Sequence, residues 1–325
     1  MNNPILQMSN TTNKKIKNVF KYWYLLVVLV FIGSITPQKS FAESLSVGVY
    51  PPIIQIQAKP PAIINNPVTL QNGSDQTITY GIFLMPFKAS NEKNGEPEFD
   101  KSLLTKYSDF FKRVQVSDGN KVITEIKLGP KQKKELNLRI SIPRDEFPRD
   151  YYFSLLFISQ DGSSSESSFT GTRAGVGANV LVTLEPKVKS TGYIKEFSSP
   201  KFITRGPVKF TLNLANTSPH YISAEGNILI KNIFGQAIGN VDLIPSNVLS
   251  RSERFLGSPD VFWNENFLIG LYTADLTLRL SDEGPILKKS ITFFAFPLEL
   301  VLGTIVTLVL VIGIARRVRR KENEG

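Results

Sequence analysis

Apolar and polar residues alternate along most of this chain, and this period of two constrains its fold more than any other feature. The pattern is clean in Glu135–Ile142, where Leu136, Leu138 and Ile140 fall on one side, and it returns in Val208–Leu214. Since successive side chains of a strand point to opposite faces, such runs predict half-buried strands. Many short strands separated by Pro, Gly and Asn turns indicate β-sandwiches and not alternating strand–helix units.

The predicted strands fall into two groups of ordinary domain size. The first group lies in residues 43–185 and the second in 186–294, with a junction at Pro186–Pro200, where lysines and serines cluster. Asp150–Ser159 is so apolar that we expect it to be a central strand covered on both faces. The predicted fold class is therefore all-β, with two tandem immunoglobulin-like β-sandwich domains.

A weak internal repeat supports two copies of one fold. In each group a tyrosine, Tyr152 or Tyr272, enters a late strand after a turn. Immunoglobulin-like sandwiches use such a tyrosine to close a corner, because its hydroxyl bonds to the backbone a few residues upstream. The alternative, that both are ordinary strand residues, stays open from the sequence.

An uncharged run of sixteen residues, 300–315, stands near the C-terminus. Together with 293–298 it reaches the roughly 20 apolar residues that a helix needs to cross a bilayer. Basic residues that flank a span stay in the cytoplasm, and five of them follow: Arg316, Arg317, Arg319, Arg320 and Lys321. The sequence predicts a transmembrane helix at 295–315, a cytoplasmic tail at 316–325, and a single-pass cell-membrane protein with an extracellular ectodomain. A buried core helix is the alternative.

The N-terminal segment has the three parts of a signal peptide. Lysines precede an apolar stretch, Tyr22–Ile35, and small Ser40 and Ala42 follow it at the positions that a signal peptidase requires. We expect residues 1–42 to be removed by cleavage between Ala42 and Glu43. An uncleaved first span is the alternative.

The charge of the chain is concentrated at its two ends. The formal net charge is +10, of which 1–42 carries +5 from five lysines and 295–325 carries +2 from five basic and three acidic residues. Residues 43–294 carry 28 basic and 25 acidic side chains, which leaves +3. A surface so nearly balanced does not indicate nucleic-acid binding.

Catalytic and metal-binding motifs are scarce. The chain has no cysteine and one histidine, His220, which excludes Cys nucleophiles, Cys/His zinc sites and histidine-based triads. The glycines of 171–177 open no predicted helix, so they do not indicate a phosphate loop. A Ser–Lys pair at 163–168 and calcium held by carboxylates such as Asp145 and Glu146 stay open as alternatives. We expect a non-enzymatic protein without cofactor or metal.

Three aromatic residues near predicted loops are candidates for contact with a partner. They are Tyr221, Phe262 and Trp263. Exposed aromatic clusters serve as anchors in binding surfaces, but the favoured alternative is that the same residues fill the core of the second domain.

The order of motifs in the second group resembles that of a known family. Pro207–Asn216 reads PVKFTLNLAN, Gly226–Gly235 reads GNILIKNIFG, and Gly270–Tyr272 precedes the apolar run and the basic tail. This resembles the WxL-interacting surface proteins of Gram-positive bacteria. The resemblance implies two immunoglobulin-like domains, one for peptidoglycan and one for a partner, ahead of a C-terminal anchor. Tyr50–Gln71 departs from the family's pattern, so no ligand-contacting residue is transferred.

The first group resembles, at a lower level, the strand order of periplasmic pilus chaperones. Together these features predict a membrane-anchored surface protein that binds or scaffolds cell-envelope proteins through its two domains. An assembly chaperone for surface subunits is one alternative, and it predicts a long exposed edge in the first domain and basic residues in the cleft. An envelope hydrolase is another, and it requires a pocket with a perturbed nucleophile.

Overall fold

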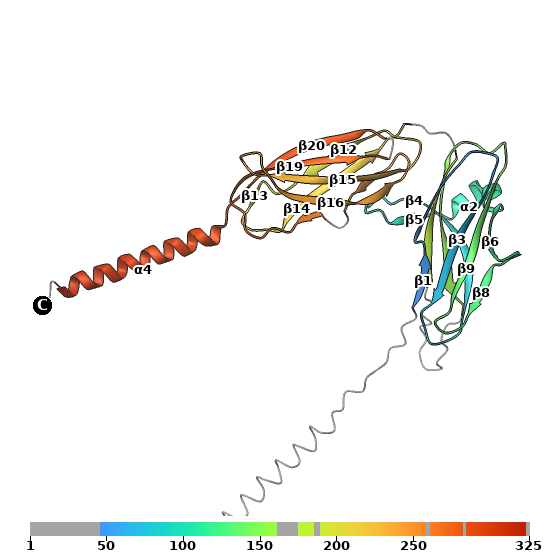
Figure 1. Ribbon diagram of the computed structural model, residues 1–325, viewed down its shortest axis with the longest axis horizontal. Helices are drawn as coiled ribbons and strands as arrows, with labels where there is room; N and C mark the ends of the chain where they lie inside the picture. The colour runs from blue at the N-terminus through green and yellow to red at the C-terminus, as the bar shows by residue number, and fades with distance from the viewer. Residues whose placement is uncertain (1–45, 161–174, 185–188, 258–260, 282–283, 323–325) are drawn as a thin grey trace, which may run out of the picture. The chain divides into compact units, whose positions relative to one another are not determined.

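The computed structural model describes residues 46–160, 175–184, 189–257, 261–281 and 284–322. The predicted signal peptide, with Ala42 and Glu43, and the predicted domain limit at 185/186 lie outside these ranges. The described chain is mostly β, arranged in four sheets that enclose two hydrophobic cores (Figure 1). The predicted all-β architecture of immunoglobulin-like sandwiches is confirmed at this level.

The first sandwich consists of two sheets. One has the order β1 (Val47–Tyr50), β3 (Ala62–Asn72), β9 (Lys133–Ile142), β6 (Val114–Asp118) and β7 (Lys121–Val122). The other has the order β2 (Ile53–Ala58), β11 (Gly175–Leu184), β10 (Asp150–Ser159), β4 (Ile78–Ala89) and β5 (Pro97–Phe99), and β8 (Glu125–Leu128) also pairs with β4. Two short helices, α2 (Ser102–Lys106) and α3 (Ser108–Phe111), precede β6.

The core of the first sandwich follows the alternation of the sequence. On β10, Tyr151, Phe153, Leu155 and Phe157 are buried, and the ring of Phe110 from α3 stacks on Tyr151 with centroids 3.8 Å apart. The prediction that this strand is central is confirmed. Its outer face differs from the prediction, because Asp150, Tyr152, Leu156 and Ile158 there are only half-buried.

The second sandwich also consists of two sheets. One contains β12 (Gly192–Ser198), β14 (Val208–Asn216) and β17 (Glu253–Phe255), and β18 (Val261–Trp263) also pairs with β14. The other has the order β13 (Phe202–Ile203), β20 (Ile286–Ala295), β19 (Gly270–Arg279), β15 (Ile222–Lys231) and β16 (Ala237–Val248). In its core, the ring of Phe293 contacts both Phe210 and Tyr272.

An asparagine fixes the same kind of corner in each sandwich. The side-chain amide of Asn72 donates to the carbonyls of Gln76, Leu128 and Gly129, and its oxygen accepts from the N–H of Ser74. Asn216 repeats this arrangement: it donates to the carbonyls of His220, Val248 and Leu249 and accepts from the N–H of Ser218. The internal repeat is therefore present in the structure at these asparagines.

The C-terminal helix α4 (Leu298–Glu322) corrects the predicted membrane span. Ala295, where the predicted span begins, belongs to β20 and is buried in the second core beside Phe293, which was predicted to lie in the second domain. The uncharged run that remains in the helix, 300–315, is about 24 Å long at about 1.5 Å per residue, whereas a hydrocarbon core is about 30 Å thick.

Within the described ranges, no helix has the length and apolar character required to cross a membrane. The predicted localisation, a single-pass cell-membrane protein with a cytoplasmic tail, is therefore wrong. Of the five basic residues assigned to that tail, Arg316 is exposed on α4. The side chains of Arg317, Arg319, Arg320 and Lys321 lie outside the described part.

Candidate binding site: the open edge of β11 and the adjacent cleft

The first half of β11 has an open edge. One side of β11 pairs with β10 from Gly175 onwards, but on the other side β2 pairs only with Asn179–Leu184. The N–H of Asn179 donates to the carbonyl of Pro52 at 2.9 Å. Main-chain groups alternate in direction along a strand, so the N–H and C=O of Gly175 and Gly177 also point away from β10. No described strand pairs with them there.

The pairing of β2 with β11 cannot extend towards Gly175, because two consecutive prolines, Pro51 and Pro52, precede β2. In the parallel register that β2 follows, the carbonyl of Gly177 would accept from residue 52, but Pro52 has no N–H to donate. The Tyr50–Pro51 peptide bond is cis, and before it β1 pairs with β3 in the opposite sheet. The chain thus changes sheets at this point, and no described strand is hydrogen-bonded to the start of β11 on that side.

Apolar side chains lie around the open edge. Val176 and, on the neighbouring β1, Val49 are partly buried against the first core. On the outer face of the sheet, Leu156 and Ile158 of β10 lie directly across from the two open glycines. Phe83 of β4 is exposed beside Leu156. An added strand would therefore find apolar contacts as well as main-chain partners.

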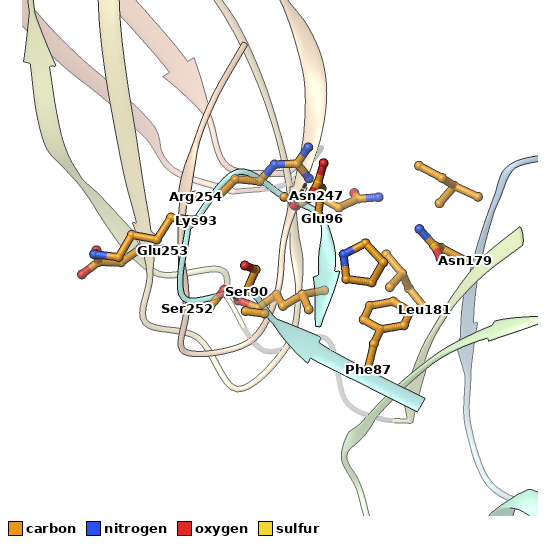
Figure 2. Close-up of a pocket in the computed structure, with 15 residues that line it drawn as sticks. Phe87, Ser90, Lys93, Glu96, Asn179, Leu181, Asn247, Ser252, Glu253 and Arg254 are labelled. Carbon is orange, nitrogen blue, oxygen red and sulfur yellow. Dashed lines mark hydrogen bonds and ion pairs between the residues drawn. The ribbon is translucent and has the colours of Figure 1, made fainter. Parts of the chain in front are cut away.

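The edge leads to a cleft between the two sandwiches (Figure 2). Its cavity has a volume of about 120 Å³. Ile53, Phe87 and Leu181 from the first sandwich and Leu249 from the second supply apolar walls. Asn179, at the first residue that β2 covers, also lines the cavity, which places the cavity at the end of the open edge.

The β4–β5 hairpin of the first sandwich closes one side of the cleft. The N–H of Phe255 on β17 donates to the carbonyl of Lys93 at 2.7 Å. The Lys93 ammonium lies 2.7 Å from the Glu253 carboxylate, which also binds Lys195. Hydrogen bonds from Lys195 and Lys93 lower the pKa of Glu253 below its usual value. The hairpin is thus attached to the second sandwich by main-chain and charged contacts.

Arg254 lies under this hairpin. Its Nη1 donates to the carbonyl of Asn247 at 2.7 Å, and its guanidinium packs against Gly95, where a Cβ would overlap it. Figure 2 shows Arg254 and Asn247 beside Glu96. Burial lowers the pKa of Arg254, because removal from water disfavours the charged form. This cation therefore supports the wall of the cleft.

A second set of polar contacts joins the sandwiches at Asp150. Its carboxylate accepts from Nδ1 of His220 and from the N–H of Tyr221, each at 2.7 Å, and from the hydroxyl of Tyr152. The Tyr152 hydroxyl also accepts from the N–H of Ser250 at 3.2 Å. Burial, and then the Asp150 charge, raise the pKa of Tyr152 far above its usual value and that of Tyr221 to about 12.

The chemistry of the cleft suits binding. Of the hydroxyls that line it, Ser252 donates to the carbonyl of Leu249 and Ser90 accepts from the N–H of Glu92. Neither bond pairs a hydroxyl with a base, which nucleophilic catalysis requires. The Ser–Lys alternative at 163–168 lies outside the described residues. Within them, no group of three or more acidic or histidine side chains is placed to hold a metal ion.

The three aromatic residues singled out in the sequence do not lie together. Trp263 is buried in the second core, with its ring against Tyr272, whereas Phe262 beside it is 42% exposed. Tyr221 lies at the Asp150 junction, at the opposite end of β15 from the Gly239 that contacts Trp263. Contact of any of them with a partner stays a prediction. Sequence reasoning missed the open glycines, because their exposure depends on where β2 ends.

Comparison with known proteins found no matching family model and no matching curated protein. Among solved structures, the class 5 fimbrial chaperone CfaA matches 78% of this chain over 100% of its own length, with 12% identity and a TM-score of 0.39. A structure of a chaperone–tip adhesin complex of CFA/I fimbriae matches 78% of this chain over 99% of its own length, with 11% identity and a TM-score of 0.38. The E. coli chaperone DraB matches 75% of this chain over 96% of its own length, with 11% identity and a TM-score of 0.37.

These solved structures are pilus chaperones, the family to which the sequence bore the weaker resemblance. At such TM-scores the likeness carries no argument about what this chain binds. No comparison supports the resemblance to WxL-interacting surface proteins, nor the peptidoglycan binding that it implied.

Proposed function

We propose that this chain binds an extended segment of a partner polypeptide by strand addition at the open edge of β11. This is the activity of an assembly chaperone, one of the alternatives drawn from the sequence. The observation that carries it is the pair of open glycines, Gly175 and Gly177, whose main-chain groups face away from β10. An added strand would satisfy these groups in the way that β-strand addition does elsewhere.

The surroundings of the edge define the partner. Four residues, Gly175–Ala178, offer only a few main-chain bonds, each with a net contribution of about 1 kcal/mol. Side chains must therefore supply most of the affinity. A strand presents alternate side chains to opposite faces, so one set would contact Val176 and Val49 and the other Leu156 and Ile158. We expect a segment with apolar residues at alternate positions and one side chain in the cleft cavity.

A scaffold that binds folded envelope proteins was the function first expected. A folded partner would present a finished surface, whereas an open strand edge is complementary to a strand that has not yet been paired. The edge therefore favours the chaperone over the scaffold.

The test is peptide binding measured by calorimetry with the full chain. Gly175→Pro removes one open N–H at the first residue of an edge strand, a position where proline is tolerated. We expect a ten-residue peptide of alternating Val and Thr to bind wild type and to lose affinity about tenfold with Gly175→Pro. Gly175→Ala keeps the N–H and is the matched control, since a Cβ there meets Ile158 only at 3.4 Å.

Two results would overturn the proposal. One is equal affinity of the proline and alanine variants for the peptide. The other is a failure of every alternating peptide to bind, while folded envelope proteins bind wild type and the proline variant alike.

A further inference from the structure

The charged residues that line the cleft cavity form opposite pairs. The Lys93 ammonium lies 2.7 Å from the Glu253 carboxylate, so these two charges neutralise each other. The other two charged residues of the lining, Glu96 and Arg254, also have opposite signs. A cavity without net charge does not compensate an ionic side chain for the hydration that it loses on entry. A neutral occupant is therefore favoured.

Asn179 offers a hydrogen-bond donor to this cavity. Its Oδ1 accepts from the hydroxyl of Ser154 at 2.6 Å, which fixes the orientation of the amide. Among the residues that the structure describes, none accepts a hydrogen bond from its Nδ2. Asn179 is half-buried and lines the cavity, so its free N–H groups are available to an occupant.

Asn247 of the second sandwich offers a second donor in the same way. Its Oδ1 accepts from Nε2 of Gln55 at 2.9 Å, and within the described ranges its Nδ2 has no acceptor. Figure 2 shows Asn179 and Asn247 around the same pocket. Since the oxygens of both amides are already engaged, only their N–H groups remain, and these require an acceptor from the occupant.

Glu96 places an acceptor in the same lining. In the described part of the chain, its carboxylate has no hydrogen-bond or ion-pair partner. An ionised carboxylate only accepts hydrogen bonds. A group that is complementary to both the amides and Glu96 must therefore carry an acceptor and a donor, as the carboxamide of asparagine or glutamine does.

The cavity has room for a carboxamide and lies close to the open edge. Its volume of about 120 Å³ is several times the roughly 10–15 Å³ that one water molecule requires. Gly177 and Asn179 face the same side of the sheet, about 7 Å apart at about 3.3 Å per residue. A side chain that enters from a strand paired with Gly177 must bridge this distance, which favours glutamine over the shorter asparagine.

We infer that the cleft cavity binds a glutamine side chain of the added segment. The glutamine carbonyl accepts from Nδ2 of Asn179 and of Asn247, and its amide nitrogen donates to Glu96. Asn179 and Asn247 are then specificity-determining residues for the strand that is added at β11. The inference rests on the proposed function, because the glutamine arrives on that strand, but it predicts a sequence preference that strand addition alone does not.

The test is a peptide scan by calorimetry with the full chain. The probe is the ten-residue peptide of alternating Val and Thr, with both termini blocked to remove their charges, and glutamine replaces each residue in turn. We expect glutamine at one position to raise the affinity for wild type about tenfold, the gain from one or two well-placed hydrogen bonds. Methionine and glutamate at that position are the controls, and neither should give this gain.

Two matched variants assign the gain to the amides. Asn179→Asp and Asn247→Asp retain the oxygen that Ser154 or Gln55 contacts but lose the N–H donors. Each should bind the unsubstituted peptide as wild type does and lose most of the glutamine gain. Asn65→Asp is the control for the added charge, because the Asn65 oxygen also accepts from an amide, in the other sheet of the first sandwich.

Circular dichroism checks that the variants are folded. If Asn179→Asp is not, Asn247→Asp carries the test alone, since its contact with Gln55 is exposed. Three results would overturn the inference while the proposed function stands: no gain from glutamine at any position although the unsubstituted peptide binds, an equal gain from methionine or glutamate, or a glutamine gain that the folded aspartate variants retain. If neither the unsubstituted peptide nor any glutamine peptide binds wild type, the proposed function fails as well.

Discussion

The carboxylate of Asp150 lies 2.7 Å from Nδ1 of His220, and the two residues belong to different sandwiches. The side chain of Asp150 is 3% exposed and that of His220 is 13% exposed. Asp150 begins the central strand of the first sandwich, and His220 precedes β15 of the second. A carboxylate so deeply buried must have partners, so the contacts of Asp150 favour the arrangement in which these surfaces of the sandwiches meet.

Replacement of Asp150 by alanine should destabilise the chain by about 3 kcal/mol. The N–H of Tyr221, His220 and the Tyr152 hydroxyl would lose their acceptor, and a buried donor without an acceptor costs about 1–3 kcal/mol. Urea unfolding followed by tryptophan fluorescence measures the change. Asp145→Ala is the control, because Asp145 is exposed a few residues away. Equal midpoints for the two variants would show that the Asp150 junction does not stabilise the fold.

Replacement of Gly95 by alanine should displace the Arg254 guanidinium and loosen the contact of the β4–β5 hairpin with β17. Gly95 has a φ of +85°, and its Cβ would overlap the Arg254 guanidinium. Gly119→Ala is a matched control, because Gly119 also has a positive φ of +56° but open space around it. In both variants the alanine must adopt a left-handed backbone conformation, which destabilises the fold by roughly 1–2 kcal/mol. Only Gly95→Ala should speed hydrogen exchange of the Phe255 amide, which donates to Lys93.

The attachment of the same hairpin should weaken in acid. The pKa of Glu253 is lowered from 4.5 by hydrogen bonds from Lys195 and Lys93. A lowered carboxyl pKa in the folded state contributes stability above the unfolded value, and this contribution is lost as the pH falls through the folded value. NMR chemical shifts of Lys93 should therefore change as the pH falls below about 4.5, the ordinary pKa of a glutamate. In Glu253→Gln this pH-dependent change in the Lys93 shifts should disappear. If it persists, the titrating group is not Glu253.

The sequence predicted those features of the fold that depend on neighbouring residues in the chain, and it missed those that depend on distant ones. Alternation in Glu135–Ile142 predicted β9, because the pattern of a strand is carried by its own residues. The Tyr272 corner is confirmed, since its hydroxyl bonds to the N–H and C=O of Ile269 three residues upstream. Tyr152 occupies the similar place in sequence, but its hydroxyl binds Asp150 and Ser250 instead, across the junction.

The candidate site was largely beyond sequence reasoning for the same reason. The open glycines depend on a parallel pairing between β2 and β11, more than a hundred residues apart. The cleft cavity combines Phe87 with Leu249, which only the packing of two sandwiches brings together. Local hydropathy also misplaced Ala295, since the end of a core strand and the start of a span are equally apolar over a few residues.

Loss of the corner asparagines should destabilise one sandwich at a time. Asn216 is 2% exposed and donates to three carbonyls, of which those of Val248 and Leu249 lie more than thirty residues away. Asn216→Ala would leave these acceptors unsatisfied, at about 1–3 kcal/mol for each buried group. We expect faster hydrogen exchange across β14, β15 and β16 in this variant, with the first sandwich unchanged. Asn72→Ala is its counterpart and should give the reverse pattern, with faster exchange in β3 and β8. Equal exchange in both sandwiches of either variant would show that they unfold as one cooperative unit, and the corners would then stabilise the whole chain and not separate domains.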